Sequence, residues 1–494
     1  MKQMSADIIV VAAGLSGLAA IISAAENGAS VLAFEKSGGT GGAANMGMGP
    51  LGVGSRFQKS RMVSLTPGEA FRKHMSYTHW QVDSRLTRDF YFKSGETIDW
   101  LEDMGVEFLE VSRYYAVPEV LRPYGTSEET WHIVKPSPGA TTAGPRAASA
   151  MIKKMTERAM DLGADIQLNT LVKKLIVEDG KVVGVIAQDA AGGQIEARAN
   201  AVIIATGGAG DNAEMIKEHT GYTWGKDLWS FRIPGTDGEG LKMAWEAGAA
   251  KTPLSLEKIF VVPDNLNHFI LDGAFRQPCL WVNADAQRFM NEDAIANTTF
   301  TGNIISQQPG RVVYSIFDAA LLKHYKKHGP DIHSHVHPAD IFDHFDEVLA
   351  ADLAQGYEHV FVADTLEELA EKTGLPCEEL LKTVDEYNDM CENGFDEIYE
   401  KEHRDLQSIK KGKFYAIRFF PSAYGTLGGI KINYKTEVVN PEGKAIAGLY
   451  AVGVDACNIY GDSYPFIMPG NTMGFAINSG RIAGENAARY ASEQ

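Results

Sequence analysis

The chain has 494 residues, of which 45% are hydrophobic and 22% charged, the balance of a globular protein with a large core. Its net charge of −18 excludes a broad nucleic-acid-binding surface, which needs clustered lysine and arginine. The four cysteines are Cys279, Cys377, Cys391 and Cys457, and no two of them form a CxxC pair. This spacing excludes an iron–sulfur cluster, a zinc ribbon and a c-type haem attachment site. Few, unpaired cysteines favour a reducing compartment.

The residues before the strand pattern that begins at residue 7 do not show the features of a signal peptide, which are a basic segment, a long apolar run and a cleavage site. Residues 8–25 are apolar over a length that could cross a membrane. Gly14, Ser16 and Gly17 interrupt this stretch where a turn would fall, which favours a buried strand followed by a helix. We therefore expect a cytoplasmic protein without membrane insertion.

Residues 7–35 predict a strand, a glycine turn, a helix and a second strand. The strand at 7–11 is β-branched and apolar, as in a parallel sheet buried on both faces. Gly14 lets the backbone approach a pyrophosphate, and Gly17 lets the helix pack close to the strand. Glu35 ends the second strand, 18 residues after Gly17, where a carboxylate can bind the ribose hydroxyls. The unit is therefore predicted to bind a dinucleotide, the alternative being an ordinary strand–helix–strand unit.

Ala12 stands where the GxGxxG pattern has its first glycine. Alanine is less permissive than glycine at positive φ, so we expect the turn to avoid positive φ at this residue.

A glycine-dense loop at 36–49 follows Glu35 and indicates FAD rather than NAD, since an NAD site seldom needs such a loop. Two further buried strands, at 201–208 and 448–453, also run into glycine turns. These three junctions predict one sheet assembled from distant segments, with the cofactor across its carboxyl edge.

Together these motifs resemble the flavoprotein subunits of the fumarate reductase and succinate dehydrogenase superfamily, which also holds the 3-ketosteroid dehydrogenases. The resemblance covers essentially the whole chain in the same order. The matching positions are Gly14, Gly17, Glu35, Lys36, Gly41, Gly42, Ala205, Thr206, Gly207, Gly208 and residues 288–292, 425–429, 448–453, 470–474 and 480–484.

The resemblance implies an α/β fold in which a Rossmann-like FAD-binding domain, residues 1–252 and 423–494, is interrupted by an α+β capping domain for substrate, residues 253–422. The loop at 38–49 has no histidine where membrane relatives attach FAD, so the flavin is expected to be non-covalent. The expected cofactor-binding residues are Ala13, Gly14, Leu15, Ser16, Gly17, Glu35, Lys36, Gly41, Gly42, Ala43, Ala44, Met48, Gly49, Val172, Ala205, Thr206, Gly207, Asp237, Gly453, Asp455, Gly470, Asn471 and Met473.

The chain departs from the fumarate reductase pattern at three substrate-binding positions. Ala296 falls where the proton-donating arginine would sit, and Tyr424 replaces a histidine before the Thr-x-Gly-Gly motif. Ile467 replaces the arginine that clamps the substrate. A dicarboxylate needs cationic groups to offset its desolvation, so fumarate and succinate are excluded as expected substrates.

The apolar segment 458–468 is instead expected to line a pocket for a small hydrophobic substrate. By resemblance, the enzyme would act as an ene-reductase or α,β-dehydrogenase on the C–C bond of a bulky ring substrate such as a steroid enone. Two alternatives stay open: an isoflavonoid or phenolic substrate, as in tetrahydrodaidzein reductases, and a non-catalytic FAD-binding module.

A flavin enzyme of this type needs a positioned acid or base for the proton that accompanies the hydride. The candidates are Tyr464, Tyr424, Tyr460 and Arg276. Each has a non-catalytic alternative: the tyrosines could be packing aromatic residues, and Arg276 could be a surface charge. On weaker grounds, an aromatic loop is also expected to line the pocket: Tyr114, Tyr115 and Tyr124.

His333, His335 and His337 alternate along the chain, but no acid or cysteine completes a metal site, and a solvent-facing loop is expected. The chain has no second nucleotide-binding unit and no motif for a haem or a cluster. Electrons would therefore come from a separate donor protein, from visiting NAD(P)H or from another diffusible donor. The oligomeric state is left open.

Overall fold

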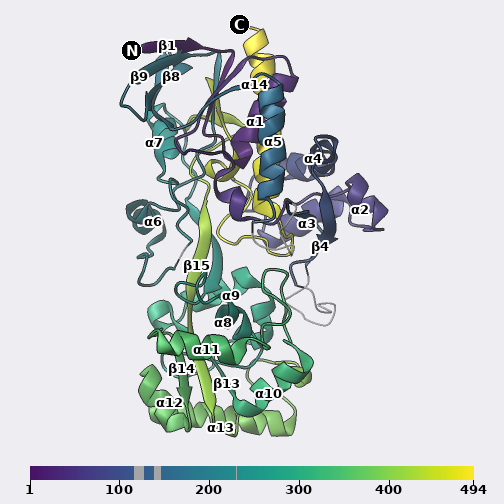
Figure 1. Cartoon of the computed structure of the whole chain (residues 1–494), viewed down its shortest axis with the longest axis vertical. Coiled ribbons are helices and arrows are strands. Elements are labelled where there is room, and N and C mark those ends of the chain that lie inside the picture. Colours follow the sequence, from purple (N-terminus) through teal and green to yellow (C-terminus); the bar gives the residue numbers. More distant parts are fainter. Residues whose placement is uncertain (116–126, 138–145, 230) are drawn as a thin grey trace.

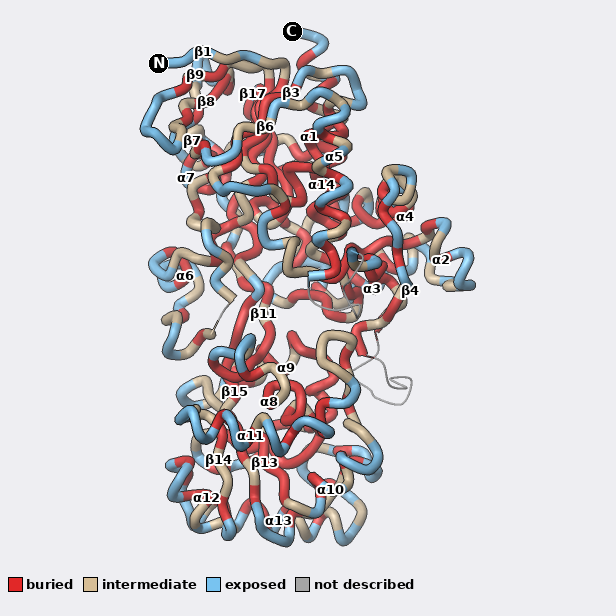
Figure 2. The backbone as a smooth tube through the Cα atoms, in the orientation of Figure 1, coloured by how far each residue is buried: buried red, intermediate tan, exposed pale blue. Residues whose placement is uncertain are grey.

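The computed structural model describes residues 1–115, 127–137, 146–229 and 231–494. The molecule is elongated, with both chain ends at one end and a second layered region at the other (Figure 1). Buried residues concentrate along the strands of both regions and between the long helices (Figure 2). The expected α/β class with a cap over a cofactor-binding region is confirmed.

The central sheet has six strands in the order β16-β17-β10-β2-β3-β6. Its strands are β2 (Ile8–Val11), β3 (Val31–Phe34), β6 (Asp165–Gln167), β10 (Ala201–Ile204), β16 (Glu437–Val439) and β17 (Ala445–Ala451). The expected adjacency of the three glycine junctions is confirmed, because β10 pairs in parallel with both β2 and β17. The carboxyl ends of all three strands therefore meet at one edge of the sheet.

The turn after β2 leads directly into α1 (Leu15–Glu26). The expectation that Ala12 avoids positive φ is wrong, because its φ is +78°. The reversal from strand to helix needs a left-handed residue at this point, and alanine adopts it at a cost of about 1–2 kcal/mol. A Cβ atom added at Gly17 would lie 2.0 Å from the carbonyl oxygen of Ala12, so this glycine is required for the close approach.

Helix α14 (Asn471–Ser492) packs along α1, although the two are more than 440 residues apart in the chain. Gly480 and Gly484 allow this contact. Added Cβ atoms would lie 2.3 Å from the Ser16 carbonyl oxygen and 2.7 Å from the Ala20 carbonyl oxygen, respectively. The C-terminal helix therefore holds the cofactor-binding turn from behind.

A second sheet near the chain ends has the order β1-β9-β8-β7, from β1 (Lys2–Ser5), β7 (Thr170–Glu178), β8 (Lys181–Asp189) and β9 (Gln194–Arg198). A hairpin joins β4 (Phe108–Ser112) and β5 (Trp131–Val134). The helices of this half are α2 (Arg56–Ser60), α3 (Pro67–Tyr77), α4 (Ser84–Asp103), α5 (Ser149–Asp161), α6 (Ala213–Thr220) and α7 (Glu239–Glu246).

The other half is built on β11 (Ser255–Val261), β12 (Leu280–Asn283), β13 (Val313–Asp318), β14 (Val360–Ala363) and β15 (Phe414–Leu427). β15 runs through both halves of the molecule (Figure 1): its first residues pair with β13 and β14, and its last residues pair with β11. The surrounding helices are α8 (Phe269–Ala274), α9 (Thr298–Ser306), α10 (Ala319–His328), α11 (Phe345–Ala354), α12 (Leu366–Thr373) and α13 (Cys377–Asn393).

A buried group of four charges fastens the segment after α13 to the rest of this half. The Arg288 guanidinium contacts both Glu292 and Asp396 at 2.8 Å, and the Lys401 ammonium lies 3.4 Å from Glu292. Burial alone would raise the pKa of Asp396, but hydrogen bonds and the charge of Arg288 lower it to about 2. Two positive and two negative charges therefore balance within a region closed to water.

Replacing Asp396 with asparagine should lower the free energy of unfolding by about 3–5 kcal/mol, because the buried cluster would then hold two positive charges against one negative charge. Thermal unfolding followed by circular dichroism measures the change. Asp385→Asn, on the exposed face of α13, is the control and should leave the melting temperature within about 1 °C, as surface substitutions usually do. Equal melting temperatures for the two variants would contradict a stabilising role for the cluster.

Within the described residues, no helix combines the length and apolar character that crossing a membrane requires.

Candidate active site

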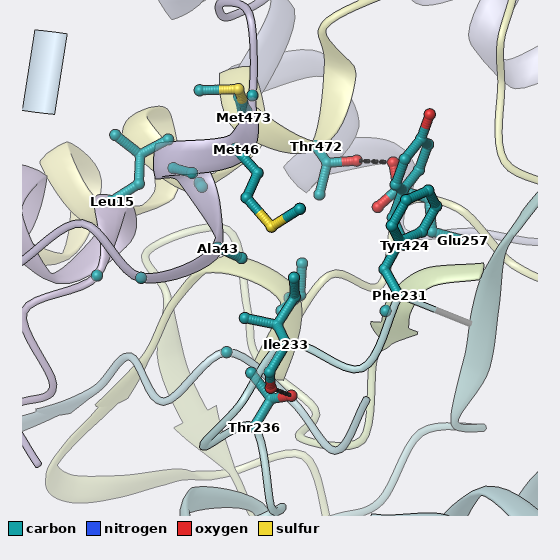
Figure 3. A pocket seen from close by; sticks show the side chains of 18 of the residues that line it. Leu15, Ala43, Met46, Phe231, Ile233, Thr236, Glu257, Tyr424, Thr472 and Met473 are labelled. Atoms are coloured by element: carbon teal, nitrogen blue, oxygen red, sulfur yellow. Dashed lines mark hydrogen bonds between the residues drawn. The ribbon is translucent and has the colours of Figure 1, made fainter. Parts of the chain in front are cut away.

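A cavity of 810 Å³ lies where the carboxyl ends of β2, β3 and β10 face β11, α8 and β15. It is continuous from the dinucleotide-type turn to the cap, so one cavity offers space for both a cofactor and a substrate. Figure 3 places Leu15, Ala43, Met46 and Met473 on one side, with Phe231, Tyr424 and Glu257 on the other.

The Glu35 carboxylate is held in a fixed orientation at the cofactor end. Its Oε2 accepts a hydrogen bond from the Ala13 amide at 2.8 Å, and its Oε1 accepts from the amide and hydroxyl of Ser37, each at 2.8 Å. Glu35 also lines the cavity, so the remaining acceptor sites of the carboxylate are available to a ligand. This arrangement suits the hydroxyl groups of a ribose.

The N-terminus of α1 opens into the same cavity. Gly14 is its N-cap residue, no side chain caps the helix, and the first turn contains no acidic residue. Gly14, Leu15 and Ser16 all line the cavity. Free amide groups and the positive end of the helix dipole therefore face the ligand space, which suits a pyrophosphate.

Most of the residues expected to bind the cofactor line this cavity. They are Gly14, Leu15, Ser16, Glu35, Lys36, Gly41, Gly42, Ala43, Ala44, Met48, Gly49, Val172, Ala205, Thr206, Gly207, Asp237, Gly453, Gly470 and Met473. The other four lie behind its wall: Ala13, Gly17, Asp455 and Asn471.

Asp455 has a role that the motif did not predict. It is fully buried and accepts hydrogen bonds from the amides of Thr206, Gly207 and Gly208 at 2.5, 3.1 and 2.7 Å. The residue therefore joins the turn after β10 to the segment after β17. It supports the cavity wall from behind and does not line it.

Three of the four proton-transfer candidates line the cavity: Tyr464, Tyr424 and Arg276. Tyr460 does not. Its side chain is 1% exposed, and its hydroxyl donates a hydrogen bond to Asn471 at 2.8 Å. Asn471 in turn donates to Tyr91, so the Tyr460 hydroxyl belongs to a buried structural network.

The side chain of Arg276 is only 12% exposed and pairs with Asp272 at 2.6 Å, so the alternative of a surface charge is wrong. His337 lies on the other side of Asp272, with its Nε2 3.8 Å from the carboxylate, and burial lowers its pKa. The expectation of a solvent-facing histidine loop is therefore wrong for His337, which lines the cavity because the chain returns there to pack on Phe269. No group of three or more potential metal ligands occurs among the described residues.

Tyr424 and Tyr114 form a pair of hydroxyl groups next to this ion pair. Each hydroxyl influences the pKa of the other, and the Arg276 charge acts on both. Burial raises the pKa of both tyrosines, while the guanidinium opposes the increase. Tyr424 lines the cavity and the residue as a whole is 37% exposed, so a ligand in the cavity can contact it.

The expected aromatic loop contributes one residue to the cavity. Tyr114 lines it, whereas the Tyr115 hydroxyl is directed to Thr298 at 2.9 Å and to the Ile295 carbonyl at 3.1 Å. Tyr124 lies outside the described residues.

Sequence reasoning missed a carboxyl group in the cavity wall. Glu257 on β11 is 8% exposed and accepts a hydrogen bond from the Thr472 hydroxyl at 2.5 Å (Figure 3). The Tyr464 hydroxyl lies 2.9 Å from both the amide and the hydroxyl of Thr472. The only signal in the sequence is a single acid between apolar residues at 254–262, which is too common to identify a site.

The three substituted positions offer no cation to this cavity. Ala296 and Ile467 do not line it, and Tyr424 supplies a hydroxyl in place of an imidazole. Among the described lining residues the basic side chains are Lys36, Arg276 and His337. Lys36 is paired with Asp237 and Glu239, and Arg276 with Asp272. The described wall therefore has no unpaired lysine or arginine for a carboxylate ligand.

A family model described as an FAD binding domain matches residues 7–472. Vinyl phenol reductase of Lactiplantibacillus plantarum is 31% identical over an alignment that covers 100% of this chain and 98% of that protein.

Two solved structures have a similar fold over nearly the whole chain. The open conformation of a flavocytochrome c3 fumarate reductase superposes with a TM-score of 0.72 at 26% identity, covering 99% of this chain and 79% of that one. The 3-ketosteroid-Δ4-(5α)-dehydrogenase of Rhodococcus jostii, in complex with 4-androstene-3,17-dione, gives 0.75 at 25% identity, covering 99% and 98%.

Proposed function

Because the chain belongs to the FAD binding domain family and is an FAD-dependent oxidoreductase related to fumarate reductases and ketosteroid dehydrogenases, we propose that it reduces a C–C double bond conjugated to a phenolic ring. FAD supplies hydride exchange when it is bound. The chain must then hold the ring, exclude water and supply the accompanying proton.

The observation that carries this proposal is the aromatic wall opposite the cofactor-binding turn. Tyr424 stacks on Phe231 with ring centroids 5.1 Å apart, and Tyr114 stacks on Trp131 at 5.7 Å. Phe466 meets the Tyr114 ring edge-on at 4.8 Å. Aromatic side chains pack favourably against a flat aromatic ligand, and the paired cations give little support to a dicarboxylate.

Tyr424 is the proposed proton donor. Tyr424 lines the cavity next to Tyr114, and the charge of the Arg276 guanidinium acts on both residues. The positive charge favours the tyrosinate that forms when a proton leaves. The Asp272 carboxylate pairs with Arg276 and has His337 on its other side, so the guanidinium is held in place beside the cavity.

A steroid enone is the second candidate, favoured by the size of the cavity and by the likeness to a steroid-binding relative. The hydroxyl of Tyr464 already hydrogen-bonds the amide and the hydroxyl of Thr472, each at 2.9 Å, so it is less available to a steroid carbonyl. This difference supports a phenolic substrate over a steroid.

The test is reoxidation of the reduced holoenzyme under anaerobic conditions. Protein reduced with dithionite is mixed with 4-vinylphenol, an isoflavonoid enone, 4-androstene-3,17-dione or fumarate, and the flavin absorbance is followed. We expect the phenolic compounds to restore the oxidised spectrum fastest and fumarate to have no effect. Reoxidation by fumarate alone would contradict the proposal, and a preference for the steroid would support the second candidate.

The electron donor is proposed to be external to the chain, either NAD(P)H or a separate carrier protein. The same reduced-flavin assay distinguishes them when NADH, NADPH or a reduced carrier replaces dithionite.

A further inference from the structure

The carboxyl group of Glu257 lines the cavity, and the proposed reaction does not yet use it. It projects from β11 into the cavity wall and meets the first turn of α14 at Thr472. Glu257 and Tyr424 lie on the same side of the cavity (Figure 3). A substrate whose double bond lies near Tyr424 would therefore have other atoms within reach of Glu257.

The carboxyl group retains capacity to accept hydrogen bonds. The two oxygens of a carboxylate offer about four acceptor sites, and the hydroxyl of Thr472 occupies one of them. No ion pair among the described residues includes Glu257. A ligand that donates a hydrogen bond can therefore satisfy this group, whereas a ligand carboxylate would be repelled by its ionised form.

The groups around Glu257 are uncharged at neutral pH. Tyr464 lies in the segment before α14, Tyr424 lies on β15, and Cys457 and Tyr460 follow β17. Burial raises the pKa of Glu257 to about 7, although hydrogen bonds from Thr472 and Tyr464 oppose the increase. The carboxyl group therefore changes its charge within the range in which enzymes are assayed.

We propose that Glu257, positioned by Thr472 and Tyr464, is the subsite that accepts the hydroxyl group of a phenolic substrate. This inference rests on the proposed function. It adds that Glu257 selects a free phenol over the corresponding ether, which has no hydroxyl proton to donate. Glu257 is a specificity residue in this scheme, and Tyr424 delivers the proton to carbon.

The test compares two ligands that differ only in this proton, 4-vinylphenol and its methyl ether 4-methoxystyrene. Their dissociation constants for the oxidised holoenzyme are measured from changes in the flavin absorbance, without turnover. We expect the phenol to bind roughly 10- to 100-fold more tightly, as for a hydrogen bond to a charged acceptor. Glu257→Gln should remove most of this preference, whereas Glu442→Gln, in an exposed turn, should retain it.

The pH dependence of the wild type gives a second measurement that needs no variant. The preference for the phenol should increase as pH rises through about 7, because the carboxylate accepts a hydrogen bond more strongly than the neutral acid. It should decline again near pH 10, where a phenol ionises and the two anions repel each other. The preference in Glu257→Gln should not change around pH 7.

An unchanged preference in Glu257→Gln would overturn the subsite while leaving the proposed reaction intact. A shifted flavin spectrum in the ligand-free variant would also overturn it, by placing Glu257 against the cofactor. If neither ligand binds the wild type and neither reoxidises the reduced enzyme, the proposed function fails together with the subsite.

Discussion

Replacing Tyr424 by phenylalanine should lower the turnover number by about 10²–10⁴-fold, the usual effect of removing a general acid. The substitution removes one oxygen atom and keeps the ring that stacks on Phe231. FAD content and the dissociation constant of the substrate should therefore change little. The loss should fall on kcat, because the hydroxyl acts when the proton is transferred.

Single-turnover reoxidation of the reduced variant measures this step directly. Tyr434→Phe is the matched control, since Tyr434 is 40% exposed and does not line the cavity. It should react at the wild-type rate. If Tyr424→Phe also keeps the wild-type rate while Tyr464→Phe loses activity, the proton comes from Tyr464 and the proposed assignment is wrong.

Replacing Gly17 by valine should give a protein that does not retain FAD. The first added carbon would lie 2.0 Å from the Ala12 carbonyl oxygen, and this neighbour is backbone that cannot rotate away. Overpacking a rigid site costs about 1–3 kcal/mol even when side chains can adjust. Helix α1 must therefore move away from β2, which displaces the amides that face the pyrophosphate.

The ratio of flavin to protein absorbance in the purified variant measures the effect. Gly39→Ala is the control, because an added Cβ at that position meets no atom within 4 Å and its φ is not positive. It should bind FAD normally. A yellow Gly17→Val protein with wild-type FAD content would show that the helix does not need this close approach.

The cofactor half of the site could be predicted from the sequence because its signals are local. A buried strand, a glycine turn and Glu35 lie within 30 residues, and the structure places this set on one cavity wall. Ala12 marks the limit of that reasoning. Propensity disfavours alanine at positive φ, but the connection between β2 and α1 imposes it.

The substrate half could not be predicted in the same way, since its groups meet through tertiary packing. Glu257 reaches Thr472 across 215 residues, and His337 approaches Asp272 only after the cap has folded. Neither residue belongs to a motif. The loss of the family's arginines at Ala296 and Ile467 could be recognised because the family pattern has an arginine at each position. No pattern identifies the groups that line the cavity in their place.

The order of strands in the central sheet has a consequence for how the protein is made. β2 and β10 emerge early from a ribosome, but β17 and α14 complete the sheet and support the turn only after residue 492 has been synthesised. The N-terminal binding turn therefore keeps one side of its helix uncovered until α14 has been synthesised. We expect FAD loading to follow that step, so that a nascent chain without α14 would meet proteases and chaperones before it holds the cofactor.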